Sequence, residues 1–176
     1  MRLYLPATAS ELLADTPPAR PALTFTAPPD AHGEALDALA EEVLYEAAFA
    51  SLELVYETDE APCRIVLVAE IDLGAQTSPT AGGITGTTAT VTTGSTGTVG
   101  DKNTERGAVR CTTWAQVQAI HADGQVGQEI IASLRQAETQ EQADELVEKL
   151  DEKPLEWFSA LELPYLAASL AAAYTD

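Results

Sequence analysis

The sequence predicts a mixed α/β protein, either α/β or α+β, in which helices pack against a single-layer mixed sheet of about five or six strands. Three observations lead to this fold class. Short apolar segments typical of strands recur along the chain, and longer segments carry an apolar residue every three or four positions, which is typical of helices. The two kinds alternate, as in a sheet covered by helices. A hairpin-like spacing at residues 113–117 adds an antiparallel pair, so a mixed sheet is expected.

The N-terminal segment predicts two short strands with a short helix between them. Residues 2–5 alternate polar and apolar side chains and stop at a proline, which is typical of a strand. Thr8 and Glu11 have the spacing of a capping box and predict the start of a short helix. Residues 22–27 alternate apolar side chains with threonine and predict the second strand.

A long acidic helix is expected over residues 33–57, either as one helix or as two with a bend. Its apolar residues form a wide stripe, and its acids fall mostly on the opposite face. Residues 63–73 are the strongest strand prediction, because their apolar run is continuous and β-branched, as in a central strand buried on both faces. Glu70 and Asp72 mark the end of that strand.

Residues 75–107 differ in composition from the rest of the chain. Between positions 76 and 100 there are ten threonines, six glycines and no charged residue. This composition predicts a flexible low-complexity insertion, and a threonine-rich hairpin around residues 89–92 is the alternative. The length of 176 residues is typical of one domain, so residues 1–176 are expected to form a single domain that carries this insertion.

The remaining sequence predicts three more strands and three more helices. The strands are expected at residues 108–113, 117–122 and 155–160, and the helices at residues 125–137, 141–150 and 161–174. Pro164 falls in the first turn of the last helix, where proline is tolerated. Asp123 and Gly124 form a turn signal after a strand, so Asp123 is expected to cap the helix that follows.

Composition limits the classes of partner and the compartment. The chain has 28 acidic and 9 basic side chains, a formal net charge of −19, so nucleic acid is not an expected partner and a basic protein is. No apolar run has the length of a secretory signal or of a membrane span, and no membrane association is expected. Cys63 and Cys111 form no CxxC motif and predict two buried thiols in a cytoplasmic protein, with a disulfide as the alternative.

Several short segments, in their order and spacing, resemble an uncharacterised actinobacterial family of small acidic α/β proteins. The segments are residues 1–8, 42–48, 117–123, 155–158 and 162–166. The resemblance spans nearly the whole chain except residues 75–107. It implies one compact cytoplasmic domain with the insertion at its periphery. Because the family has no assigned activity, the resemblance implies no function and no cofactor.

Known catalytic and cofactor motifs are missing from the sequence. It has no phosphate-binding loop, no nucleophile motif and no cluster with metal-ligand spacing, so neither a cofactor nor a metal is expected. One polar constellation stands out: His121 and Asp123 follow one predicted strand, and Glu70 and Asp72 end another. In open α/β sheets, ligands gather at the carboxyl ends of strands. These four residues are the candidate catalytic residues, and packing of His121 with capping by Asp123 is the alternative that the turn signal favours.

These observations leave the biochemical function unknown and favour a non-enzymatic protein-binding or accessory domain. The first alternative is a small enzyme with a polar site near His121 and Asp123. The second is a structural protein that associates with itself through an exposed sheet edge.

Overall fold

The computed structural model describes residues 1–27, 32–58, 60–71, 104–106 and 110–174, and its strands form one sheet. Within these residues the order of strands is β4-β2-β1-β3-β5-β6, and every neighbouring pair is antiparallel. The strands are β1 (Arg2–Ala7), β2 (Leu23–Phe25), β3 (Ile65–Glu70), β4 (Thr104–Arg106), β5 (Val117–Ala122) and β6 (Glu156–Ser159). The predicted class of helices on a single sheet is confirmed. The expected mixture of parallel and antiparallel pairs is wrong.

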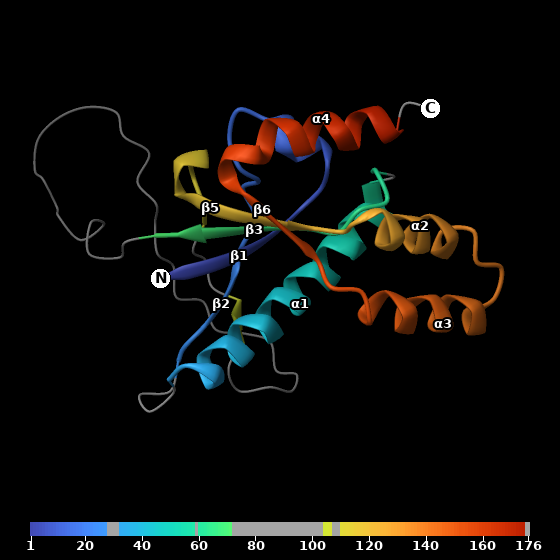
Figure 1. Ribbon diagram of the computed structural model, residues 1–176, viewed down its shortest axis with the longest axis horizontal. Coiled ribbons are helices and arrows are strands. Elements are labelled where there is room, and N and C mark those ends of the chain that lie inside the picture. Colours follow the sequence, from blue (N-terminus) through green and yellow to red (C-terminus); the bar gives the residue numbers. More distant parts are fainter. Residues whose placement is uncertain (28–31, 59, 72–103, 107–109, 175–176) are drawn as a thin grey trace, which may run out of the picture.

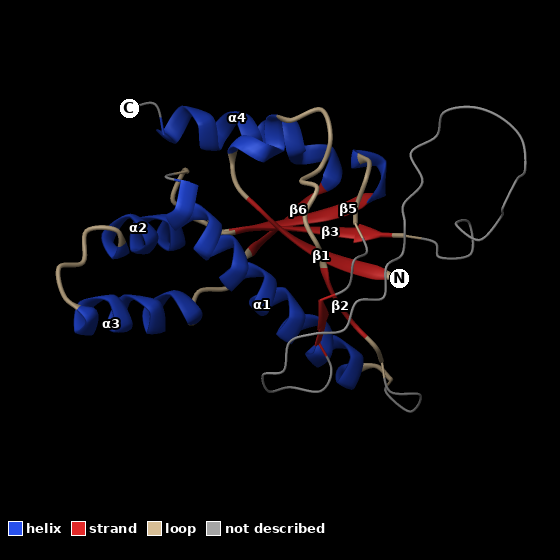
Figure 2. Ribbon diagram, turned by 180° about the vertical axis from the view of Figure 1, so that it is seen from behind, coloured by secondary structure: helices blue, strands red, loops and turns tan. Residues whose placement is uncertain are grey.

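Helices lie on both faces of this sheet and beyond one of its ends (Figures 1 and 2). They are α1 (Glu34–Thr58), α2 (Gln125–Leu134), α3 (Gln140–Asp151) and α4 (Leu163–Tyr174). Figure 1 shows α1 and α4 on opposite faces, and α2 and α3 beyond the end at which β5 leaves the sheet. Of the helices in the described ranges, none combines the length and the apolar character needed to cross a membrane.

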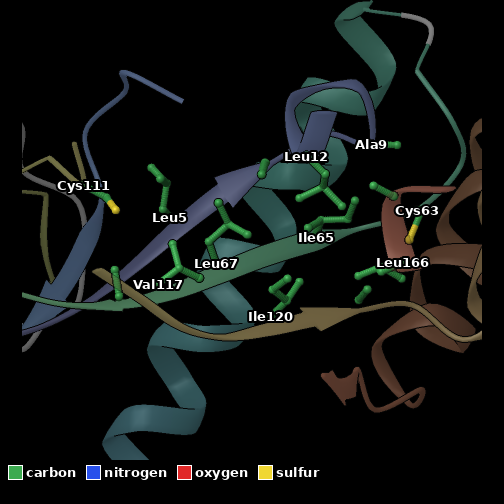
Figure 3. Close-up of a cluster of buried hydrophobic side chains, with 14 of the residues drawn as sticks. Leu5, Ala9, Leu12, Cys63, Ile65, Leu67, Cys111, Val117, Ile120 and Leu166 are labelled. Atoms are coloured by element: carbon green, nitrogen blue, oxygen red, sulfur yellow. The ribbon is translucent and has the colours of Figure 1, made fainter. Parts of the chain in front are cut away.

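The central strand β3 is buried on both faces, as its apolar run predicts. Ile65 and Leu67 pack in the cluster beneath α4, which is drawn in Figure 3. Val66 and Val68 point the other way and pack in the cluster under α1. Alternate residues of a strand face opposite sides, so a strand between two helical layers must be apolar at every position.

A third cluster joins the C-terminal half of α1 to α2 and α3. Its buried members are Leu52, Val55, Ile131, Leu134 and Leu150. This cluster lies outside the sheet, and it holds α2 and α3 beside α1. The two halves of α1 therefore pack against different parts of the protein. The N-terminal half covers the sheet, and the C-terminal half contacts α2 and α3.

One buried hydroxyl ties α1 to the two central strands. Ser51 Oγ donates a hydrogen bond to the Ala7 carbonyl at 2.8 Å and accepts one from the Ile65 N–H at 2.8 Å. Ser51 is fully buried. We expect Ser51→Ala to lower the free energy of unfolding by about 1–3 kcal/mol, because the Ile65 N–H loses its partner away from water. Urea unfolding would measure this loss, and Ser133→Ala at an exposed position of α2 is the control, expected to leave stability unchanged or slightly raised.

The structure corrects two boundaries around the predicted insertion. Residues 104–106, which were expected to belong to the insertion, form β4 and pair with β2. Residues 110–113 were expected to be a strand, yet they form a loop before the short 3-10 turn Trp114–Gln116. The rest of the insertion, including the alternative hairpin at residues 89–92, lies outside the described residues.

The N-terminal helical predictions are confirmed in part. The long helix is one continuous helix, Glu34–Thr58. The expected short helix after Thr8 is only a 3-10 turn over Ser10–Leu13. Half of its predicted capping box is present, because the Glu11 carboxylate accepts a hydrogen bond from the Thr8 N–H at 2.9 Å.

Both cysteines are buried and free, as expected from their apolar surroundings. Figure 3 shows Cys63 and Cys111 at opposite ends of the cluster beneath α4. Burial, with a smaller contribution from the nearby Asp123 carboxylate, raises the pKa of the Cys63 thiol to about 12. The thiol therefore stays protonated at neutral pH and packs as a small apolar side chain.

Candidate functional site

The antiparallel sheet separates Glu70 from His121, although the sequence predicts that both lie in one polar site. His121 lies opposite Val66 in the pairing of β5 with β3. Glu70 lies four residues further along β3, roughly 13 Å away at 3.3 Å per residue, and its carboxylate is 3.8 Å from Arg2. Asp72 lies outside the described residues. The carboxyl ends of two neighbouring antiparallel strands lie at opposite ends of the sheet. Glu70, at the end of β3, therefore does not come close to His121 and Asp123, at the end of β5.

Asp123 is bound to an arginine rather than to a helix end. Its carboxylate accepts hydrogen bonds from Arg64 Nε at 3.0 Å and Arg64 Nη2 at 2.8 Å, and from the Arg64 backbone N–H at 2.8 Å. Arg64 is 2% exposed and Asp123 3% exposed. The N-cap of α2 is Gly124, without a side-chain hydrogen bond. The prediction that Asp123 caps this helix is therefore wrong.

The same arginine reaches the end of α3. Arg64 Nη2 donates hydrogen bonds to the carbonyl oxygens of Leu150 and Lys153, each at 3.3 Å. Both carbonyls lie at or just after the C-terminal end of α3, where the helix dipole makes a cation favourable. Asp123 and Arg64 thus fasten α3 to the sheet, and the buried carboxylate is committed to a structural ion pair.

His121 lies half-buried on the face of the sheet that α1 covers, opposite Trp157 of the edge strand β6. Burial lowers the pKa of its imidazole below the ordinary value of 6.5. The charged form is therefore disfavoured in the folded state. The alternative interpretation of His121 as a packed side chain fits this environment.

This lowered pKa predicts a pH dependence of stability. The unfolded chain binds a proton at His121 more readily than the folded chain. The neutral imidazole therefore makes its full contribution to the free energy of unfolding above pH 6.5, and this contribution decreases as the pH falls below that value. We expect His121→Gln to make the fall of Tm between pH 7 and pH 5 less steep. Thermal unfolding across this range would measure it, with His32→Gln at an exposed position as the matched control. An unchanged slope would contradict the prediction.

A groove of about 760 Å³ lies between the C-terminal half of α1, the end of α2 and the start of α3. Its volume is within the range of about 300–1,000 Å³ found for small-molecule and cofactor sites. The residues that line it are apolar or aromatic (Phe49, Leu52, Tyr56, Leu134, Ala137, Ala143, Val147), acidic (Glu53, Glu57, Glu138) or neutral and polar (Thr139, Gln140). It lies over the third cluster, which supplies its apolar floor.

Two large aromatic side chains of α1 form one wall of the groove. Phe49 is 51% exposed and Tyr56 is 43% exposed. They lie seven residues apart, which is two helical turns, so both project from the same side of α1. Aromatic side chains that stay exposed beside an apolar floor are characteristic of binding surfaces.

The rim of the groove is acidic. Glu53 and Glu57 lie one turn apart on α1, and Glu138 lies in the connection between α2 and α3. All three side chains are exposed. Within the part of the chain that the structure describes, no lysine, arginine or histidine lines the groove. A ligand there meets negative charge from α1 and from the connection between α2 and α3.

Arg135 lies behind this groove and is engaged at the end of α1. Its Nη2 donates hydrogen bonds to the Val55 carbonyl at 2.7 Å and the Glu60 carbonyl at 2.5 Å. Burial raises the pKa of Tyr56, and the positive charge of Arg135 opposes this rise. The arginine therefore supports one wall of the groove from outside its lining.

The groove was not predicted from the sequence, although the sequence contains one signal for it. Phe49 and Tyr56 both fall outside the apolar stripe of the long helix, which runs through Val43 and Ala47. Large aromatic residues away from a buried stripe need another reason to be there. Which surface they line depends on where α3 packs, and helical periodicity does not contain that information.

The fold and the groove together define a class: an α+β protein with an antiparallel sheet and an acidic, aromatic groove between helices. The chain belongs to DUF6912, a family of unknown function whose model matches residues 1–167. Comparison with curated proteins and with solved structures finds no match. The resemblance to a family without assigned activity is confirmed at this level, and the family names no function for the groove.

Proposed function

We propose that this protein is a non-enzymatic binding protein that holds a basic segment of another protein in the groove between α1 and α3. The observation that carries the proposal is the groove itself, with its apolar floor, its aromatic wall and a rim of carboxylates. Apolar and aromatic contacts supply affinity, and the carboxylates select for positive charge.

The acidic rim favours a cationic ligand on energetic grounds as well. Glu53 and Glu57 lie at positions i and i+4 of α1, where like charges repel each other. A lysine or arginine between them relieves this repulsion. The net charge of −19 adds a long-range attraction for the same ligand.

The other two functions expected from the sequence have less support. A small enzyme at His121 and Asp123 needs a free carboxylate, whereas Asp123 is held by Arg64. Self-association through this groove would bring a second chain of charge −19 against an acidic rim. Nucleic acid meets the same repulsion. The two free, buried cysteines support a reducing compartment, and we place the protein in the cytoplasm.

A synthetic peptide of lysine and leucine tests the proposal against an otherwise identical peptide with glutamate in place of lysine. Isothermal titration at about 0.1–0.15 M salt should show binding of the lysine peptide alone. Glu53→Gln/Glu57→Gln should weaken that binding about tenfold or more, because each carboxylate contacts the ligand.

The matched control is Glu41→Gln/Glu42→Gln, which removes the same charge from exposed positions of α1 away from the groove. This control should change the affinity less than about twofold, since exposed charges beyond a Debye length of about 8–10 Å are screened. An equal loss in both double variants would show non-specific attraction and contradict the groove. Absence of binding would contradict the proposed function altogether. His121→Gln should leave the affinity unchanged.

A further inference from the structure

We infer that the segment in the groove binds as an amphipathic α-helix, with its apolar side chains between α1 and α3 and its lysines or arginines on both flanks. This inference rests on the proposed function and adds the conformation and the side-chain pattern of the partner. It follows from the walls of the groove, the spacing of its aromatic residues and the placement of its charges.

The walls of the groove exclude an extended partner as the main mode of binding. They are mainly helices, α1 on one side and α3 on the other, with residues 137–139 of the α2–α3 connection between them. The backbone N–H and C=O groups inside a helix bond to each other, so they offer no ladder to an added strand. An extended peptide would bury its own backbone groups against apolar side chains without partners. A helical peptide satisfies its backbone internally and presents side chains alone.

The aromatic spacing matches a helical ligand. Phe49 and Tyr56 lie about 10.5 Å apart along the axis of α1, at 1.5 Å per residue. A helix laid beside α1 repeats its apolar positions at i and i+7 with the same separation. Ala143 and Val147 lie one turn apart on α3, and both are only partly buried. The small Ala143 side chain leaves room for an anchor residue between the two helices.

The charges fall on both sides of the apolar floor. Glu53 and Glu57 belong to the wall made by α1, and Glu138 belongs to the connection between α2 and α3. A bound helix therefore meets carboxylates from α1 and from the connection between α2 and α3. Lysines or arginines that flank the apolar stripe on each side satisfy this arrangement, and the ligand completes a bundle with α1, α2 and α3 around the third cluster.

The decisive experiment compares two peptides of identical lysine and leucine composition, each about four turns long. One peptide places leucine at i, i+3, i+4 and i+7, and its isomer alternates leucine and lysine. Titration should give the helical pattern at least a tenfold higher affinity, and circular dichroism should show a gain of helix when it binds. Phe49→Ala and Tyr56→Ala should each weaken it about tenfold or more, whereas Tyr165→Ala at an exposed position of α4 should leave it unchanged.

The outcomes separate this inference from the proposed function. If the alternating isomer binds equally well and still depends on Glu53 and Glu57, the helical conformation is overturned and the basic-segment groove stands. If neither peptide binds, the proposed function fails with it. Thermal unfolding of each variant should show that the exposed aromatic residues are not needed for folding, and Glu53→Gln/Glu57→Gln supplies a second variant that removes no apolar contact.

Discussion

Asp123→Ala is expected to lower the free energy of unfolding by about 3–5 kcal/mol. The change leaves the Arg64 guanidinium buried without its carboxylate and frees the Arg64 backbone N–H. Removing one partner of a buried ion pair lowers the free energy of unfolding more than removing both partners, because the remaining charge stays buried away from water. For a protein of this size the loss corresponds to a decrease in Tm of roughly 6–20 °C, measurable by calorimetry.

Two controls separate this effect from the loss of charge alone. Glu70→Ala breaks an exposed pair with Arg2, whose side chains are 59% and 53% exposed, and is expected to cost less than about 1 kcal/mol. Arg64→Met/Asp123→Leu removes the buried pair as a unit and should recover much of the stability that Asp123→Ala loses. A loss below about 1 kcal/mol for Asp123→Ala would mean that the ion pair contributes little to the fold.

Gly127→Ala is expected to destabilise the protein by about 1–3 kcal/mol, although alanine is the better helix former. A Cβ at this position in α2 would lie 2.5 Å from Asp123 Oδ1 and 2.8 Å from Asp123 Cγ. Alanine gains about 0.8–1.0 kcal/mol of helix propensity over glycine. The clash outweighs this gain, because the carboxylate is held by Arg64 and moves only if the ion pair is disturbed.

Gly124→Ala provides the matched comparison three residues earlier. Its Cβ would meet the end of the Glu156 side chain, which is exposed and free to rotate away. We expect a cost below about 1 kcal/mol, from replacing glycine with alanine at the N-cap of α2. Urea unfolding of both variants decides the ranking, and equal costs would show that Asp123 adapts to the added methyl group.

The sequence predicts the elements of this fold better than their arrangement. The strand β3 and the helix α1 are predicted because burial on two faces, or on one stripe, leaves a period in the residues themselves. The direction of a strand relative to its neighbours does not change the period of its apolar residues. Strand β5 runs antiparallel to β3, and this direction is not encoded in the period of either strand, so periodicity alone could not show whether Glu70 lies near His121.

The candidate site depends even more on contacts between distant residues. The partner of Asp123 is Arg64, 59 positions earlier, and no local pattern links them. The Asp-Gly turn signal correctly placed the end of β5, and it gave the wrong role to the aspartate. The groove becomes visible only when α3 packs beside α1 and leaves Phe49 and Tyr56 uncovered.

The order of strands in the sheet also determines how quickly the native state is reached. Tyr4 pairs with Val68, Leu23 pairs with Arg106, and Ile120 pairs with Phe158, so the chain must close long loops before the sheet exists. Topologies dominated by such distant pairs fold on the scale of milliseconds to seconds. During synthesis at about 5–20 residues per second, the apolar β1 emerges several seconds before its long partner β3, and only the short β2 can pair with it in the interval. The half-made chain, rather than the finished protein, is therefore the form most exposed to aggregation, and its excess of acids keeps neighbouring nascent chains apart.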